Sequence, residues 1–178
     1  MNMIPFERSY WVLPNRFIVG EIPASMKEEE TIAKLNGLIR VNVNVVINLM
    51  EVDEKNYENK SFYDYAPYLN KHNIETHRLP IKDLSIPSID TMRDILSIVQ
   101  DSIRQKKIVY LHCWGGVGRT GTAVGCFLLN NSLASKENVL ETINYLKRTT
   151  SIDKRESPET EEQRKFIMEW PASEESIS

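Results

Sequence analysis

The centre of the sequence is residues 108–121, which read IVYLHCWGGVGRTG. The apolar run from Ile108 to Leu111 predicts a strand, and the residues that follow Gly118 predict a helix. The glycine-rich loop between them is typical of an anion site, because loop amides and the positive end of a helix meet there. The stretch therefore predicts a parallel α/β sheet with a ligand site at the carboxyl end of one strand.

Outside this centre, strand and helix patterns alternate along the chain. Such alternation predicts one α/β domain with a central, mainly parallel sheet flanked by helices. We expect the domain to span residues 1–170 and residues 171–178 to be a disordered tail. The expected strands are two between Tyr10 and Gly20, one from Val43 to Leu49 and one from Glu75 to Ile81. Further helices are expected to begin near Ser25, Tyr63, Ser88, Ser135 and Ser157.

The composition narrows the functional class. The 178 residues include 22 Lys and Arg against 25 Asp and Glu, a net charge of −3 that disfavours binding to duplex nucleic acid. Two cysteines do not make a disulfide framework. Neither a secretion signal nor an apolar run of the ~20 residues needed to span a membrane is present. We therefore expect a cytoplasmic protein, most simply a monomer, without a membrane span.

The residue types in the loop point to nucleophilic attack on a phosphate. The guanidinium of Arg119 can bind two oxygens of a tetrahedral anion, and the same positive field favours the thiolate form of Cys113. The three loop glycines, Gly115, Gly116 and Gly118, allow backbone angles that a β-carbon resists. An anion cradle built around a thiolate is what attack on a phosphate monoester requires. The spacing of Cys and His residues fits no metal site, and we expect no cofactor.

The decapeptide HCWGGVGRTG resembles the signature loop of the cysteine-based protein tyrosine phosphatases, in the form of the dual-specificity branch. It is most similar to the version in the cyclin-dependent-kinase-associated phosphatases and small bacterial relatives. The runs YWVLPNRFIVGEIP and VVINLMEVDE resemble the first strands and the central strand of these proteins. The similarity extends from Ser9 to Trp170 and implies a dual-specificity phosphatase-like fold.

The resemblance also assigns roles to individual residues. It makes Cys113 the nucleophile, with His112 tuning the thiolate and Thr120 donating a hydrogen bond to the sulfur. Arg119 and the backbone of the loop would bind phosphate, and Asp83, upstream on the loop KDLSIPS, would be the general acid. The loop residues meant are Trp114, Gly115, Gly116, Val117 and Gly118; the Trp114 side chain itself is expected to pack outside the cradle.

The segment ESPETEEQRKF resembles the family's glutamine-bearing loop only in part. Gln163 matches the second glutamine and is the candidate for positioning the attacking water. Glu159 stands where the first would be, either weakening turnover or simply complementing the start of a helix. Cys126 reads as a core residue rather than a redox partner of Cys113, and Lys147 as a solvated charge.

The expected function is metal-independent hydrolysis of phosphomonoesters through a phosphocysteine. The expected substrate is a protein phosphotyrosine, with phosphoserine or phosphothreonine as further possibilities. Two alternatives stay open within the family. One is a catalytically weak module that binds phosphoproteins, and the other is a phosphatase of a small metabolite or phosphoinositide. A sulfur-transfer or arsenate-reducing enzyme is disfavoured by the upstream Asp83 and by the late position of Cys113.

Overall fold

The computed structural model describes residues 3–171 and is built around a five-stranded sheet in the order β1-β2-β5-β3-β4. The first two strands pair antiparallel, and the remaining pairs are parallel. This confirms the expected mainly parallel sheet; of the expected tail, only Pro171 lies within the described residues. The strands are β1 (Ser9–Leu13), β2 (Phe17–Gly20), β3 (Val45–Asn48), β4 (Glu75–Arg78) and β5 (Val109–His112).

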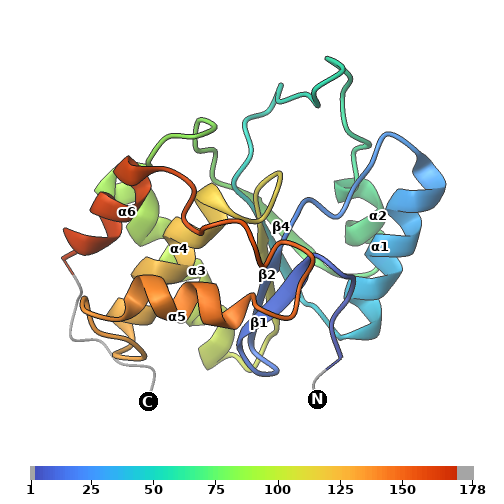
Figure 1. Cartoon of the computed structure of the whole chain (residues 1–178). Coiled ribbons are helices and arrows are strands. Elements are labelled where there is room, and N and C mark those ends of the chain that lie inside the picture. Colours follow the sequence, from blue (N-terminus) through green and yellow to red (C-terminus); the bar gives the residue numbers. More distant parts are fainter. Residues whose placement is uncertain (1–2, 172–178) are drawn as a thin grey trace.

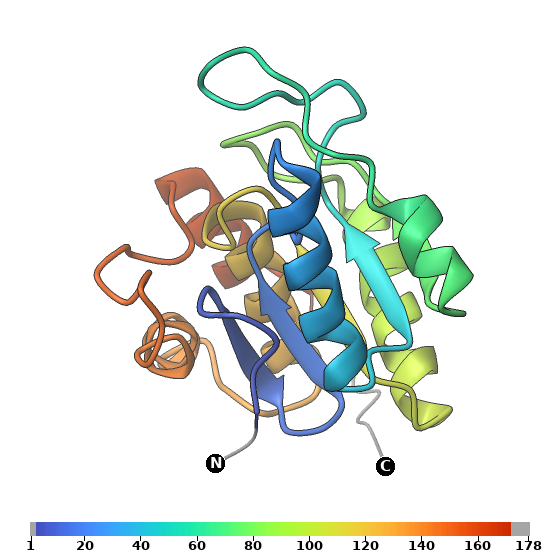
Figure 2. The same cartoon turned by 90° about the vertical axis from the view of Figure 1, so that its right-hand side faces the viewer.

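Helices cover both faces of the sheet (Figures 1 and 2). Successive residues of a strand point to opposite faces, and so Phe17 and Val19 lie in one core while Ile18 lies in the other. Burial on both faces explains why β2, β3 and β5 are buried at every position. One face packs against α3 (Ile89–Arg104), α4 (Gly118–Asn130), α5 (Val139–Leu146) and α6 (Glu161–Met168), the other against α1 (Glu28–Arg40) and α2 (Ala66–Lys71).

The central helix α4 follows the glycine-rich loop directly. All of its residues are buried, because it lies between the sheet and the helices α3, α5 and α6. A helix enclosed in this way gives the loop in front of it a fixed support. Within residues 3–171, each helix is too short or too polar to cross a membrane.

Two helices begin elsewhere than the sequence predicts. Ser88 is confirmed as the cap of α3, where its hydroxyl accepts the Thr91 N–H at 3.0 Å. Ser25, in contrast, does not cap α1; its hydroxyl accepts the N–H of Lys27, and the helix starts one residue later. Likewise α5 begins after Asn138 rather than at Ser135. In both cases a serine satisfies or forms a local turn, which competes with its use as a helix cap.

The prediction that Ser157 starts the last helix is also wrong. Helix α6 begins at Glu161, and Thr160 caps it in a capping box with Gln163. Ser157 instead donates its hydroxyl to the carbonyl of Val117 at 2.7 Å. The segment in front of α6 is thereby fastened to the glycine-rich loop.

Candidate active site

The glycine-rich loop connects β5 to α4 at the carboxyl edge of the sheet. Gly116 has φ = +72°, and it is the one glycine within residues 3–171 with a positive φ. A β-carbon there would also collide with the backbone of Gly20. The expectation that all three loop glycines are needed for unusual backbone angles is therefore correct for Gly116 alone.

Gly115 and Gly118 make room for neighbouring side chains. A β-carbon on Gly118 would stand 3.0 Å from Gln163 Oε1 and 3.2 Å from Glu159 Oε2. A β-carbon on Gly115 would stand 3.2 Å from a terminal nitrogen of Arg155. The segment that leads into α6 thus lies directly against the loop.

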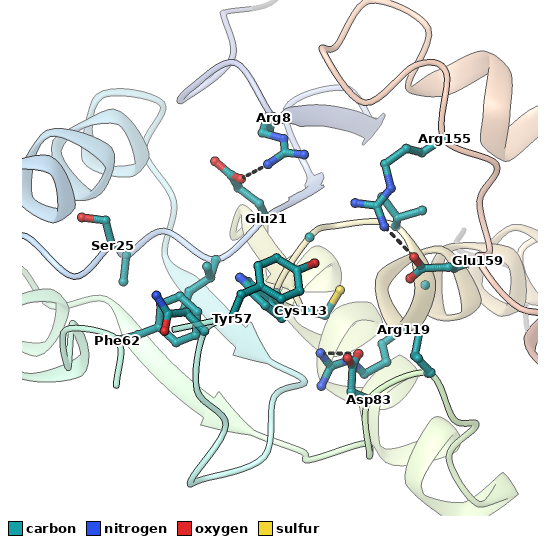
Figure 3. A pocket seen from close by; sticks show the side chains of 18 of the residues that line it. Arg8, Glu21, Ser25, Tyr57, Phe62, Asp83, Cys113, Arg119, Arg155 and Glu159 are labelled. Atoms are coloured by element: carbon teal, nitrogen blue, oxygen red, sulfur yellow. Dashed lines mark hydrogen bonds and ion pairs between the residues drawn. The ribbon is translucent and has the colours of Figure 1, made fainter. Parts of the chain in front are cut away.

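A pocket of about 600 Å³ opens at this loop (Figure 3). The N-cap residue of α4, Val117, offers no side-chain hydrogen bond, and so the amides of the first turn stay available to an anion. His112, Gly116, Thr120 and Gln163 are not among the lining residues. The predicted site residues that line the pocket are Asp83, Cys113, Trp114, Gly115, Val117, Gly118 and Arg119.

Arg119 is buried and is held by two acidic side chains. Its terminal nitrogens bind both oxygens of Glu54 at 2.6 and 2.7 Å, and one of them contacts Asp83 at 2.9 Å. Burial alone would lower the pKa of Arg119, but hydrogen bonds from Glu54 and the charge of Cys113 outweigh it and raise the pKa. Within the described residues Nε has no hydrogen-bond partner, which leaves this donor free for an oxygen of a bound anion.

Glu54 was not identified from the sequence. It lies in the polar segment 51–61, which projects from the body of the molecule between β3 and α2 (teal in Figure 1). A bridge between Lys55 and Ser61 makes this segment a small hairpin, and Tyr57 near its tip stacks on Trp114 with ring centroids 4.4 Å apart. The Trp114 side chain thus packs away from the cradle, as expected. The available signal was an acidic cluster at the carboxyl end of a strand next to β5.

Asp83 lies on the loop after β4, with 46% of its side chain exposed. A turn between Lys82 and Ser85 shapes this loop, and Leu84 within it has φ = +59°. Gln163 donates to the Ser85 carbonyl at 3.0 Å and so fastens the loop to α6. The loop therefore presents Asp83 to the pocket from the side opposite the hairpin tip.

His112 lies buried behind the nucleophile as a neutral imidazole. Its Nδ1 donates to the Cys113 carbonyl at 3.0 Å, and its Nε2 therefore accepts from the Tyr65 hydroxyl at 2.6 Å. Burial lowers the pKa of His112 to about 3. The buried hydroxyl of Thr120 has no partner within residues 3–171, and it follows Arg119 at the start of α4.

The family model described as "Tc-R-P: Polymorphic toxin system, DSP-PTPase phosphatase" matches residues 23–133, which is more than half of the chain. The chain belongs to this DSP-PTPase phosphatase family. The matched range includes Glu54, Asp83 and the loop from Cys113 to Arg119. It ends before Arg155, Glu159 and Gln163.

Known proteins show the same relationship. Protein tyrosine phosphatase domain-containing protein 1 of Danio rerio is 29% identical over 120 residues, which cover 62% of this chain but 17% of that protein. Among solved structures, Tk-PTP in its active form superposes with a TM-score of 0.72 at 24% identity, covering 93% and 97% of the two chains. Kinase associated phosphatase (KAP) gives 0.70 at 17% identity, covering 85% and 83%. At these identities the structures establish the fold.

In this DSP-PTPase phosphatase the segment before α6 departs from the expected roles. Glu159 lies one residue before the Thr160 cap, and so it is not the first-turn charge of a helix. It pairs with Arg155 at 2.5 Å and lines the pocket. Gln163 is fully buried, with its oxygen on the Thr160 N–H and its nitrogen on Ser85. Water positioning by Gln163 stays a prediction.

Two further residues complete the survey of the site. Cys126 lies in the main core on α4, and burial raises the pKa of its thiol. Lys147 is not solvated as expected but fully buried, donating to the carbonyls of Ile152 and Asp153 at 3.1 and 2.7 Å. Among residues 3–171, no group of three or more His, Cys, Asp or Glu side chains is arranged to bind a metal ion.

Proposed function

We propose that this protein hydrolyses phosphomonoesters through a phosphocysteine intermediate. The observation that carries the proposal is the meeting of Cys113, Arg119 and Asp83 in one pocket, with Asp83 Oδ1 2.9 Å from an Arg119 terminal nitrogen. A nucleophile, a bidentate cation and an acid are the three groups that the reaction needs. Arg119 and the loop amides supply positive charge at the equatorial oxygens, and so the proposed reaction needs no metal.

The first step transfers the phosphoryl group to sulfur. The Cys113 thiolate attacks phosphorus in line, the bond from phosphorus to the substrate oxygen breaks, and protonated Asp83 gives its proton to that oxygen. The incoming phosphate competes with Asp83 for Arg119, because both are anions that bind the same guanidinium. Binding of substrate therefore releases the carboxyl toward the leaving group.

The second step restores the enzyme. Asp83 takes a proton from water as the water oxygen attacks phosphorus, the bond between sulfur and phosphorus breaks, and inorganic phosphate and the thiolate form. The Thr120 hydroxyl, which has no other partner within the described chain, is placed to donate to the departing sulfur. His112 holds the Cys113 carbonyl and keeps the loop in shape without transferring a proton.

We propose protein phosphotyrosine as the main substrate. The cationic side chains that line the pocket all have carboxylate partners: Arg8 and Lys34 pair with Glu21, and Arg155 pairs with Glu159. A pocket without an unpaired cation is poorly suited to a second phosphate, which disfavours polyphosphorylated metabolites and phosphoinositides. Trp114, Tyr57 and Phe62 form an aromatic wall that favours an aryl phosphate.

One observation supports a second candidate, a phosphoprotein-binding module with weak turnover. Glu159 brings a carboxylate to the edge of the cradle, where it opposes a bound phosphate dianion. Such a module would bind phosphopeptides and release little phosphate.

The test is hydrolysis of para-nitrophenyl phosphate in the presence of EDTA by wild type, Cys113→Ser and Asp83→Asn. We expect turnover by wild type, none by Cys113→Ser, and a loss in Asp83→Asn of about 10²–10⁴-fold with poor leaving groups. Matched phosphotyrosine and phosphoserine peptides then define the substrate. Phosphopeptide binding without wild-type turnover would favour the binding module, and full activity of Cys113→Ser would refute the mechanism.

A further inference from the structure

Arg155 and Glu159 lie together against the phosphate cradle. The Glu159 carboxylate is beside Gly118, the first residue of α4, and the Arg155 guanidinium is beside Gly115. Figure 3 shows the pair next to Cys113, across from Tyr57 and Phe62. The ion pair therefore spans the glycine positions at which the loop has no side chains of its own.

The place of the Glu159 carboxylate is one that attracts anions. The N-terminal end of α4 carries partial positive charge, and its first amides receive no side-chain cap. A substrate phosphate is attracted by the same amides. Glu159 is thus a tethered anion near the binding place of the substrate, and Arg155 offsets its charge.

The backbone around the pair is anchored, whereas the two side chains are not. Lys147 fastens the carbonyls of Ile152 and Asp153, and Ser157 is fastened to Val117. The side chains of Arg155 and Glu159 keep 44% and 37% of their surface exposed. They are therefore free to change partners without a shift of the loop.

We propose that Glu159 is an internal competing anion of the cradle, which the substrate phosphate displaces as Arg155 turns from Glu159 to the phosphate. The inference rests on the proposed phosphatase function and adds a purpose for the departure from glutamine. The pair lowers the affinity of the cradle for free phosphate, and so the product leaves readily. Arg155 in turn becomes a substrate-binding residue only when phosphate is present.

The test is the affinity of the full chain for inorganic phosphate, measured by calorimetry and as competitive inhibition of para-nitrophenyl phosphate hydrolysis. We expect Glu159→Gln and Glu159→Ala each to bind phosphate about tenfold more tightly, since both remove the opposing charge. Arg155→Gln should bind it several-fold more weakly, because Glu159 is then uncompensated. The double variant Arg155→Gln/Glu159→Gln should return close to wild type, and all of these differences should shrink at high salt.

Matched controls separate this effect from a change in overall charge. Glu162→Gln, on the exposed face of α6, and Arg148→Gln, which packs on Tyr145 outside the pocket, should leave phosphate affinity unchanged. Unchanged affinity in both Glu159 variants, beside wild-type phosphate binding, would overturn this inference alone. Failure of wild type and every variant to bind phosphate would overturn the proposed function as well.

Discussion

The floor of the pocket and its rim are built in different ways. The floor, residues 112–120, is one continuous stretch that is largely buried and held by backbone bonds and α4. The rim combines three separate segments, namely the hairpin 54–62, the loop that carries Asp83, and the segment 155–159. Its side chains are mostly exposed and charged, and they meet the floor through ion pairs.

This difference separates two tasks. The floor places the nucleophile and the donors of the phosphate site, which tolerate little displacement, because a loss of about 1 Å in position costs much of the rate. The rim adjusts charge and shape around them. Changes in the floor should therefore be costly, and changes in the rim should be moderate and depend on the substrate.

The largest effect is expected from Arg119→Lys in the floor. A lysine ammonium cannot bind Glu54 and two phosphate oxygens at once, and so kcat/KM should fall by about 10²–10³-fold. The matched change in the rim is Arg8→Lys, since Arg8 contacts Glu21 through a single nitrogen at 3.0 Å. We expect that variant to stay within about threefold of wild type. Similar losses in the two variants would erase the distinction between floor and rim.

The next prediction concerns stability and pH. The pKa of His112 is lowered to about 3 in the folded chain, against about 6.5 in an unfolded one. Between these values the unfolded chain binds the extra proton, and so the stabilisation is complete above pH 6.5 and is lost as the pH falls toward 3.

Urea unfolding of wild type and His112→Asn across this range is the measurement. The stability advantage of wild type should decrease as the pH falls, by a few kcal/mol if the floor stays closed. A constant difference between the two unfolding free energies would show that His112 takes up its proton without unfolding the floor.

Glu54→Gln tests the one rim residue that reaches into the floor. A carboxamide accepts hydrogen bonds through one oxygen only, and so the Arg119 fork should lose its fixed orientation and kcat should fall about tenfold. Glu58→Gln is the control, because Glu58 lies in the same hairpin and pairs with Lys60 in solvent. Equal rates for the two variants would show that Arg119 is oriented without Glu54.

The smallest effect is expected from Tyr57→Ala. Loss of the ring that covers Trp114 should lower kcat/KM for phosphotyrosine peptides about threefold and leave the affinity for inorganic phosphate unchanged. Tyr145→Ala, outside the pocket, should change neither quantity. A parallel loss of phosphate affinity in Tyr57→Ala would mean that the hairpin tip supports the floor rather than selecting the substrate.

The floor could be predicted from sequence because its determinants are local. An apolar strand, three glycines and the Cys113 to Arg119 spacing occur within one short stretch, and the strand and helix patterns around it gave the sheet. The rim could not be predicted in this way. Glu54 is one of three acidic residues between 51 and 54, and the turn from Glu51 to Glu54 decides which of them faces Arg119.

The wrong helix starts have the same origin. Ser25 and Ser157 carry the side chains that cap helices, but their hydroxyls bond to Lys27 and to Val117 instead. Lys147 looked like surface charge, because nothing near it in sequence indicates that two carbonyls from the following loop would enclose it. Partners brought together by the tertiary fold override such local preferences.

The bond from Ser157 to Val117 bears on how much polypeptide makes a working phosphatase. The family match ends at residue 133, yet the hydroxyl that holds the Val117 carbonyl comes from well beyond it, and Asn144 in turn binds the Ser157 backbone on both sides. A fragment cut at the end of the match would keep the nucleophile and its arginine but lose this fastening. The minimal catalytic unit is therefore longer than the region by which the family is recognised.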